Sequence, residues 1–197
     1  MVRENEPVKP DRGQEPSAGD DANAKVFRPQ RILEILAKRE VEFILIGGVA
    51  TALHGAPFLT VDVDIVPALE TSNLDRLAAA LNDLDALLRD SAQPAGIRLD
   101  LDGRTLKKAI PGFGFLRFDT KFGYLDIIYK PAGIQGFGEL ARSATEEDTG
   151  SARIRVASLE DVIRSKQAVG RPRDLEQLPT LRRLLELVEE SNKDSAS

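Results

Sequence analysis

The sequence predicts an α/β fold, in which a mixed β-sheet is flanked by helices and followed by a mostly helical C-terminal part. A continuous apolar run at residues 41–46 is typical of a central strand that is covered on both faces. Apolar residues at helical spacing precede this run in residues 29–40 and follow it in residues 72–90 and 172–188. With 197 residues, the chain fits one domain, or one domain with a small appendage.

The first half of the chain alternates helices and strands. Pro29 suits the first turn of a helix, and Ser72 with Asp75 resembles a capping box at the start of another. In order, we expect a helix at 29–40, a strand at 41–46, a short helix at 48–53, an acid-bearing strand that ends near 66, and a helix at 72–90.

The second half carries shorter elements. Ser158 with Asp161 caps one helix, and Pro179 is expected to break or kink the last one, which frays from Ser191. In order, we expect a turn at 93–96, strands at 97–101, 113–119 and 123–129, a Gly-rich bend at 133–138, a polar loop at 143–151, a strand at 153–156, and helices from 159 and 172.

Composition limits where this protein works. Residues 1–25 hold almost no large apolar side chains, so we expect a disordered tail. There is no cysteine, which excludes disulfides and thiolate metal sites. No apolar run approaches the roughly 18 residues that span a bilayer, and the N-terminus lacks an apolar signal core. We therefore expect a cytoplasmic protein with no membrane partner.

Two acids stand one residue apart in the second predicted strand. Side chains at i and i+2 of a strand point to the same face, so Asp62 and Asp64 project side by side. Two carboxylates this close repel each other unless a cation lies between them. Oxygen ligands favour Mg²⁺ (or Mn²⁺) where phosphates are handled, so this pair predicts a metal site.

Asp126 is a third acid, and it interrupts the apolar strand at 123–129. An ionised carboxylate in an apolar strand is costly unless it is paired or bound to metal. One interpretation is a pair with a neighbouring Arg or Lys. The other places Asp126 beside Asp62 and Asp64, where three acids around one or two metal ions suit phosphoryl or nucleotidyl transfer.

Gly47 and Gly48 follow the buried strand and open a short helix. Backbone N–H groups at such a place form a seat for phosphate, although a Gly-Gly pair alone also fits a tight turn. Lys166 lies on the same helix face as Leu159 and Val162. It either extends along apolar surface to water or points at a buried anion.

These motifs resemble the nucleotidyltransferase superfamily, whose catalytic domain is the polymerase-β-like palm. More narrowly, IGGVATALHG with the following T-x-D-x-D, and SLEDVIRSKQAVGRPRDLEQL near the C-terminus, look like the AbiEii/MenT group of nucleotidyltransferase toxins from toxin–antitoxin pairs. The resemblance implies a palm core at 26–135 and a C-terminal part at 136–197 that completes the site. Relatives often carry Arg where this chain has Phe58.

The resemblance also implies roles for individual residues. Lys166 would hold the triphosphate of an NTP, Arg171 would be a second phosphate contact, and Asp174 would orient Lys166 or contact the nucleotide. For Arg171, a solvated turn is the other interpretation. Thr60 is expected on the same strand face as Asp62, either as a β-branched residue that only suits a strand or as a residue near the nucleotide. In related toxins a serine here is phosphorylated, which would add negative charge and block the NTP site.

The lone histidine and the charges complete the prediction. His54 is expected to end a helix, because one histidine without cysteine cannot build a zinc site. The net charge is −5, yet residues 98–121 hold six basic side chains against three acidic ones, and residues 153–173 hold six against two. Such segments suit an RNA backbone, or are simply solvated.

By resemblance, the protein would add nucleotides to the 3′ end of tRNA, block aminoacylation and be neutralised by a cognate antitoxin. Two alternatives stay open: nucleotidylation of a small molecule or a protein hydroxyl, and a non-catalytic nucleotide- or antitoxin-binding module.

Overall fold

The computed structural model describes residues 26–90 and 93–195. The predicted disordered tail at residues 1–25 therefore lies outside the described part. The strands are β1 (Phe43–Ile46), β2 (Asp62–Pro67), β3 (Leu87–Asp90), β4 (Gln93–Ile97), β5 (Phe115–Thr120), β6 (Gly123–Ile128), β7 (Thr145–Asp148) and β8 (Arg153–Val156). The helices are α1 (Pro29–Lys38), α2 (Gly47–Leu53), α3 (Thr71–Asp83), α4 (Gly103–Phe113), α5 (Phe137–Leu140), α6 (Leu159–Val169) and α7 (Pro172–Ser195).

All eight strands form one mixed sheet in the order β4-β3-β5-β6-β2-β1-β8-β7. β2 pairs with β6, and β1 with β8, in parallel, whereas the other pairs are antiparallel. The predicted α/β class with a mixed sheet is therefore confirmed. β1 is buried along its whole length, as its continuous apolar run predicts.

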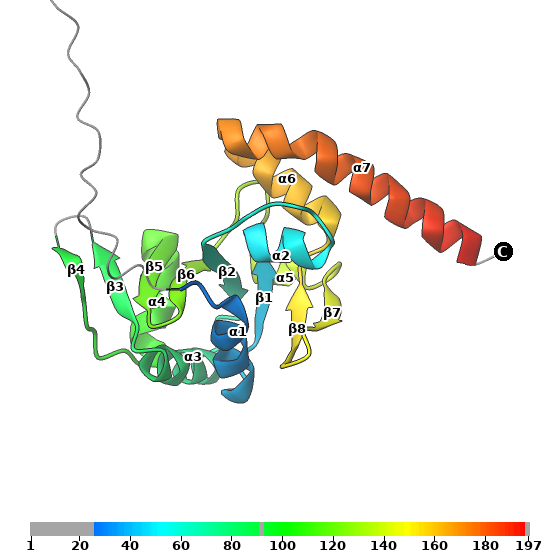
Figure 1. The fold of residues 1–197 in the computed structure, drawn as a ribbon. Coiled ribbons are helices and arrows are strands. Elements are labelled where there is room, and N and C mark those ends of the chain that lie inside the picture. Colours follow the sequence, from blue (N-terminus) through cyan, green and yellow to red (C-terminus); the bar gives the residue numbers. More distant parts are fainter. Residues whose placement is uncertain (1–25, 91–92, 196–197) are drawn as a thin grey trace, which may run out of the picture.

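Helices lie against the sheet, and the last two extend the molecule beyond α2 (Figure 1). α1, α3 and α4 lie together at one end of the view, whereas α6 and α7 lie beyond α2 at the other. The main core joins both sides of the sheet, and a second apolar cluster joins α6, α7 and the loop after α2 through Ala56, Leu159, Ile163, Leu178 and Leu181. Among the described residues, no helix combines the length and apolar character needed to cross a membrane.

Capping explains where several helices begin and end. The Ser158 side chain accepts a hydrogen bond from the N–H of Asp161, so the predicted cap of α6 is confirmed. α6 then ends at Gly170 in the left-handed conformation. The predicted helix-ending role of His54 is also confirmed, because it is the C-terminal cap of α2 and its Nε2 lies 2.8 Å from the Ala157 carbonyl oxygen.

The region from residue 84 to residue 113 differs from the prediction. The helix expected at 72–90 ends at Asp83, with Leu84 as its C-terminal cap, and Leu87 and Leu88 belong to β3, where Leu88 pairs with Phe118. The turn expected at 93–96 is strand β4, and 98–101 is not a strand. α4 was not predicted, although Asp102 caps it by accepting a hydrogen bond from the Thr105 N–H.

Three further expectations for the C-terminal part differ at least in part from the structure. The polar loop expected at 143–151 contains strand β7, whose acidic side chains pair across the ladder with basic ones of β8 (Asp148 with Arg153). The Gly-rich bend at 133–138 runs into the short helix α5. α7 continues through Pro179, so this residue does not break the helix, and Leu178 and Leu181 beside it pack in the second apolar cluster.

Candidate active site

Three aspartates meet where β2 and β6 run side by side. The two strands are parallel, and Asp64 is paired in register with Asp126. One carboxylate oxygen from each of Asp62, Asp64 and Asp126 lies within 4.8 Å of the other two. Sheet pairing therefore joins acids that lie far apart in the sequence, and we call these three residues the acid trio.

The turn at Gly47 and Gly48 packs directly against the acid trio. A Cβ atom on Gly47 would overlap the Asp64 carboxylate, and one on Gly48 would overlap the Thr60 side chain. Gly47 also has a φ of +73°, which L side chains rarely adopt. Only glycine lets the backbone approach the acid-bearing strand this closely.

Thr60 lies beside the acids, although β2 begins at Asp62 and the predicted strand position of Thr60 is wrong. Its hydroxyl donates a hydrogen bond to Asp62 Oδ1 at 2.9 Å. The side chain is half-buried. Thr60 therefore fixes one Asp62 oxygen and forms part of the wall next to the acid trio.

Arg117 on β5 is a site residue that sequence analysis did not single out. Its Nε donates to Asp126 Oδ1 at 2.8 Å, and its Nη2 donates to Asp126 Oδ2 at 2.6 Å and to Asp62 Oδ2 at 3.0 Å. The guanidinium also lies 5.7 Å from the ring centroid of Phe115 and 5.6 Å from that of Tyr124. Asp126 thus satisfies both interpretations of its sequence: it pairs with an arginine and it joins the acid trio.

The electrostatics of the trio favour added protons or bound cations. Burial, followed by the negative charges of Asp62 and Asp126, raises the pKa of Asp64 to about 7, against the lowering effects of Arg117 and the Gly48 backbone N–H. Burial also raises the pKa of Asp126, although hydrogen bonds from Arg117 oppose the rise. The same hydrogen bonds raise the pKa of Arg117, so its charge is permanent.

The acid trio opens into a cleft of about 410 Å³. The cleft brings together all nine residues that the sequence predicts for the site, from four separate parts of the chain. Those that line it are Gly47, Gly48, Thr60, Asp62, Asp64, Asp126, Lys166, Arg171 and Asp174. Phe58, at the position where the resembled family often has Arg, also lines it.

Lys166 and Asp174 form an ion pair within this cleft. Lys166 Nζ lies 2.9 Å from Asp174 Oδ1, and the side chains are only 14% and 17% exposed. α6 carries the lysine and α7 carries the aspartate. The pair fixes a cationic group in the cleft and holds the two helices together.

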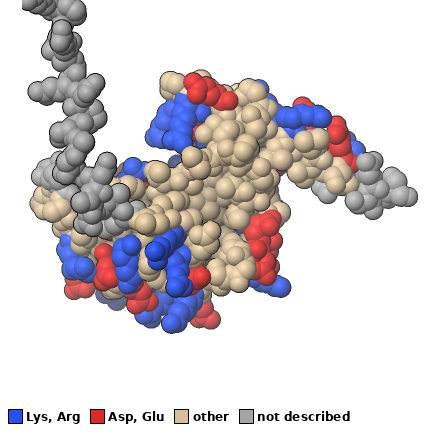
Figure 2. Space-filling view, viewed as in Figure 1, with Lys and Arg blue, Asp and Glu red and all other residues tan. Residues whose placement is uncertain are grey.

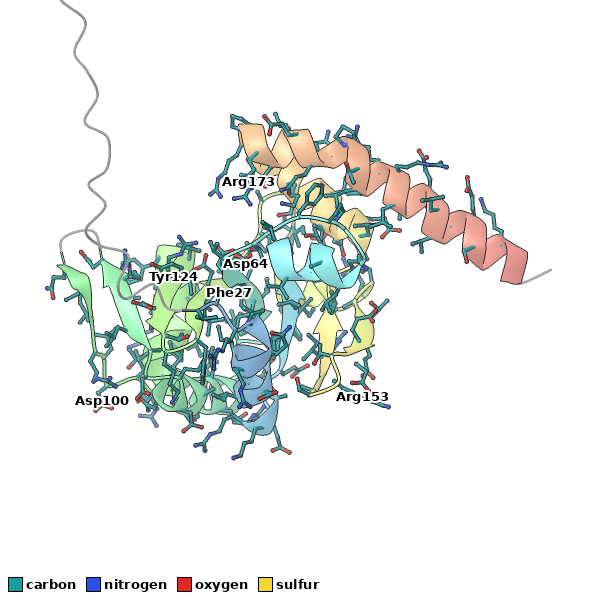
Figure 3. The ribbon with its side chains drawn as sticks, viewed as in Figure 1. Phe27, Asp64, Asp100, Tyr124, Arg153 and Arg173 are labelled. Carbon is teal, nitrogen blue, oxygen red and sulfur yellow. The ribbon has the colours of Figure 1, made fainter. Side chains whose placement is uncertain are left out.

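Further basic side chains surround the opening. Arg171 and Arg173 are exposed at the start of α7, and Arg173 Nη2 donates to the Leu59 carbonyl oxygen at 2.7 Å. Figure 3 labels Arg173 on the part of α7 that lies over the region of Asp64, and Figure 2 shows Lys and Arg atoms gathered at that end of α7. Together with Lys130, which also lines the cleft, they make its opening basic.

The acid trio fits a divalent metal. Three carboxylates from two neighbouring strands provide the oxygen donors that Mg²⁺ and Mn²⁺ prefer, and their close approach is unfavourable without a cation. Asp62, Asp64 and Asp126 are therefore the residues that would hold it.

The fold is similar to that of a solved nucleotidyltransferase. The crystal structure of the lincosamide antibiotic adenylyltransferase LnuA, bound to lincomycin, matches with a TM-score of 0.54 and 14% identity, over 82% of this chain and 99% of that one. A Thermotoga maritima protein assigned provisionally as a nucleotidyltransferase matches with a TM-score of 0.47 and 18% identity, over 82% and 96%. No family model matches the sequence, and neither does any curated protein.

The likeness to LnuA defines the class of fold: a nucleotidyltransferase fold with a mixed sheet and flanking helices. At 14% identity it concerns the fold alone, so the activity follows from the site.

Proposed function

We propose that the protein is a metal-dependent nucleotidyltransferase that transfers NMP from an NTP to a hydroxyl group and releases pyrophosphate. The observation that carries this proposal is the acid trio, which shares one cleft with Lys166. Mg²⁺ or Mn²⁺ held by Asp62, Asp64 and Asp126 would neutralise the triphosphate and activate the attacking hydroxyl. The fold shared with an adenylyltransferase supports the same class of reaction.

In the proposed reaction, an acceptor hydroxyl oxygen forms a bond to the α-phosphorus of the NTP. The bond from that phosphorus to the bridging oxygen breaks, and pyrophosphate leaves. Asp126 takes the hydroxyl proton, a role supported by its place in the trio and by its raised pKa. Lys166 and Arg171 neutralise charge on the triphosphate, and Asp174 orients Lys166 through its 2.9 Å ion pair.

The Gly47-Gly48 turn is the proposed seat of the nucleotide phosphates. It opens α2 at the end of β1 and lines the cleft beside the acid trio. The Cβ directions of both glycines face Asp64 and Thr60, so backbone N–H groups at the start of α2 would bind the phosphates.

For the acceptor, we propose the 3′ end of tRNA. Support comes from the resemblance of residues 41–66 and 153–185 to nucleotidyltransferase toxins, and from the basic side chains around the cleft. Nucleotides added there would block aminoacylation and stop translation. In this proposal the protein is a cytoplasmic toxin, and a cognate antitoxin is its protein partner.

A small-molecule acceptor is the second candidate. It is favoured by the likeness to LnuA, whose name describes an antibiotic adenylyltransferase. Four large apolar side chains at the cleft are exposed and would suit an apolar acceptor: Leu59, Val61, Phe115 and Val169. A protein hydroxyl is a further acceptor of the same kind, and a non-catalytic nucleotide-binding or antitoxin-binding module is the alternative without chemistry.

One experiment separates these acceptors. The protein is incubated with each of the four α-labelled NTPs, Mg²⁺, and either total RNA, protein extract or lincosamide and aminoglycoside antibiotics. Label at the 3′ end of tRNA is the expected result. Label only in protein or in an antibiotic would contradict the tRNA acceptor and favour a protein or small-molecule acceptor. Nucleotide binding without any labelled product would favour the non-catalytic module.

Thr60 is the proposed site of a regulatory phosphorylation. Its hydroxyl is 2.9 Å from Asp62 Oδ1, so a phosphate of about −1.5 to −2 charge would lie against the acid trio. The expected result is that an antitoxin with kinase activity phosphorylates wild-type protein and not Thr60→Ala. A Thr60→Ala protein that the antitoxin still neutralises fully would contradict it.

A further inference from the structure

Arg117 contacts the same carboxylate oxygens that would bind a metal. We propose that Arg117 competes with a divalent cation for Asp62 and shares Asp126 with it, so that Arg117 sets the metal affinity of the acid trio. This inference rests on the proposed metal site, and it concerns a positioning residue that acts through the trio.

The hydrogen bonds show which carboxylate oxygens are already engaged by protein groups. Arg117 donates to both oxygens of Asp126 and to Oδ2 of Asp62, while Thr60 donates to Oδ1 of Asp62. All four oxygens of these two carboxylates therefore already accept a hydrogen bond. A guanidinium that binds a carboxylate through two parallel bonds uses one of the two in-plane lone pairs on each oxygen, so a metal ion has only the other lone pair of each oxygen.

Charge acts in the same direction. The trio carries up to three negative charges, and the guanidinium of Arg117 supplies one permanent positive charge within hydrogen-bond distance of two of them. A divalent cation coordinated by the same oxygens would lie close to this charge and be repelled by it. Metal binding is therefore weaker than three carboxylates alone would give.

Arg117 contacts Asp126 and Asp62 differently, and the difference indicates which contact a metal ion would replace. Asp126 is its cross-strand partner and takes two hydrogen bonds, whereas Asp62 takes one at 3.0 Å. The rings of Phe115 and Tyr124 also keep the guanidinium on the β5–β6 side. We therefore expect a bound metal to release Asp62 from Arg117, while the pair with Asp126 remains.

Titration with Mn²⁺, followed by calorimetry and by electron paramagnetic resonance of free Mn²⁺, tests the competition. Arg117→Met is expected to bind Mn²⁺ at least about tenfold more tightly than the wild type, because the competing charge is gone. Arg39→Met is the matched control, because it removes another two-bond Arg–Asp pair, with Asp83, on the surface. Unchanged or weaker binding by Arg117→Met would overturn the inference.

The wild-type protein provides a second test, in which a variant serves only to assign one signal. Arg117 Nε–H is observed by ¹⁵N NMR during a Mg²⁺ titration, with its signal assigned from Arg117→Lys. It is expected to shift in step with Mg²⁺ occupancy, while the Arg39 signal stays fixed. A constant Arg117 signal at saturating Mg²⁺ would overturn the inference and leave the proposed function intact. No Mg²⁺ or Mn²⁺ binding at all would overturn both.

Discussion

Asp64 on β2 and Asp126 on β6 occupy the same register position in a parallel strand pair. Neighbouring side chains in register point to the same face of a sheet, so each carboxylate raises the cost of ionising the other. Asp62 adds a third charge two residues away, and Arg117 offsets part of the total. This arrangement explains both the raised pKa of Asp64 and the suitability of the trio for a metal ion.

The raised pKa of Asp64 predicts how stability depends on pH. The pKa is about 7 in the folded protein and 3.8 for the ordinary group, so between these values the folded state holds a proton that the unfolded state has lost. Stability without divalent cations therefore falls as pH rises through this window, by at most about 1.4 kcal/mol per pH unit for one proton, and levels off above it.

Urea unfolding at about pH 5.5 and about pH 8 measures this effect. We expect lower stability at the higher pH, and a smaller difference for Asp64→Asn. Asp83→Asn is a suitable control, because its hydrogen bond with Arg39 lowers the pKa of Asp83, so it is ionised throughout this range. An Asp64→Asn protein with the wild-type pH dependence would show that Asp64 titrates normally.

Gly47→Ala is expected to damage both stability and transfer. An alanine at a φ of +73° costs about 1–2 kcal/mol, and its Cβ would displace the Asp64 carboxylate. A misplaced reactive group lowers the rate by about 100-fold. Thermal unfolding and labelled-NTP kinetics measure the two effects. Gly112→Ala is the control, because a Cβ there meets nothing within 4 Å; equal behaviour of the two variants would exclude a special role for Gly47.

Lys166→Met is expected to weaken NTP binding. Lys166 is only 14% exposed in a cleft shared with the acid trio, and a charge-assisted contact to phosphate is worth about 1.5–3 kcal/mol. We predict a fall in kcat/KM of about 10- to 100-fold, mostly through KM. Lys121→Met, which removes an exposed pair with Asp85, should leave both constants unchanged. If Lys166→Met keeps the wild-type KM for NTP, Lys166 does not contact the nucleotide.

Asn73→Ala is expected to destabilise the fold without direct effect on the site. Asn73 is 1% exposed; its side chain donates to the carbonyl oxygens of Glu42 and Ala68 and accepts from the Glu42 N–H. Its removal takes the partner from the Glu42 N–H and from the buried Ala68 carbonyl oxygen, and a buried polar group left unpaired costs about 1–3 kcal/mol. Asn82→Ala, at an exposed position of the same helix, should change stability by less than about 0.5 kcal/mol in urea unfolding. Similar losses for both would contradict the structural role of Asn73.

Local patterns in the sequence predicted the acids well. The i and i+2 spacing placed Asp62 and Asp64 on one strand face, and the apolar context marked Asp126 as unusual. The close approach at Gly47-Gly48 agrees with a turn that needs glycine. These inferences held because each depends on one strand or one turn.

Features that depend on strand register were missed. Arg117 looks like one of many basic residues until the tight turn between Thr120 and Gly123 is extended along the hairpin, which places Arg117 opposite Asp126. β7 has the composition of a loop, because its acidic residues stand opposite basic residues of β8 and stay outside the core. β3 was taken for helix because leucine suits both elements, and pairing with β5 decides between them.

Comparison of the wild type with Asp62→Asn in the labelled-NTP assay tests whether the acid trio performs nucleotidyl transfer. The loss of one metal ligand should lower transfer at least about 100-fold, because metal catalysis contributes several kcal/mol. Circular dichroism and thermal unfolding establish that the variant is folded. We predict Mg²⁺-dependent label in the wild-type reaction and almost none with Asp62→Asn. Undiminished transfer by a folded Asp62→Asn protein would contradict the account.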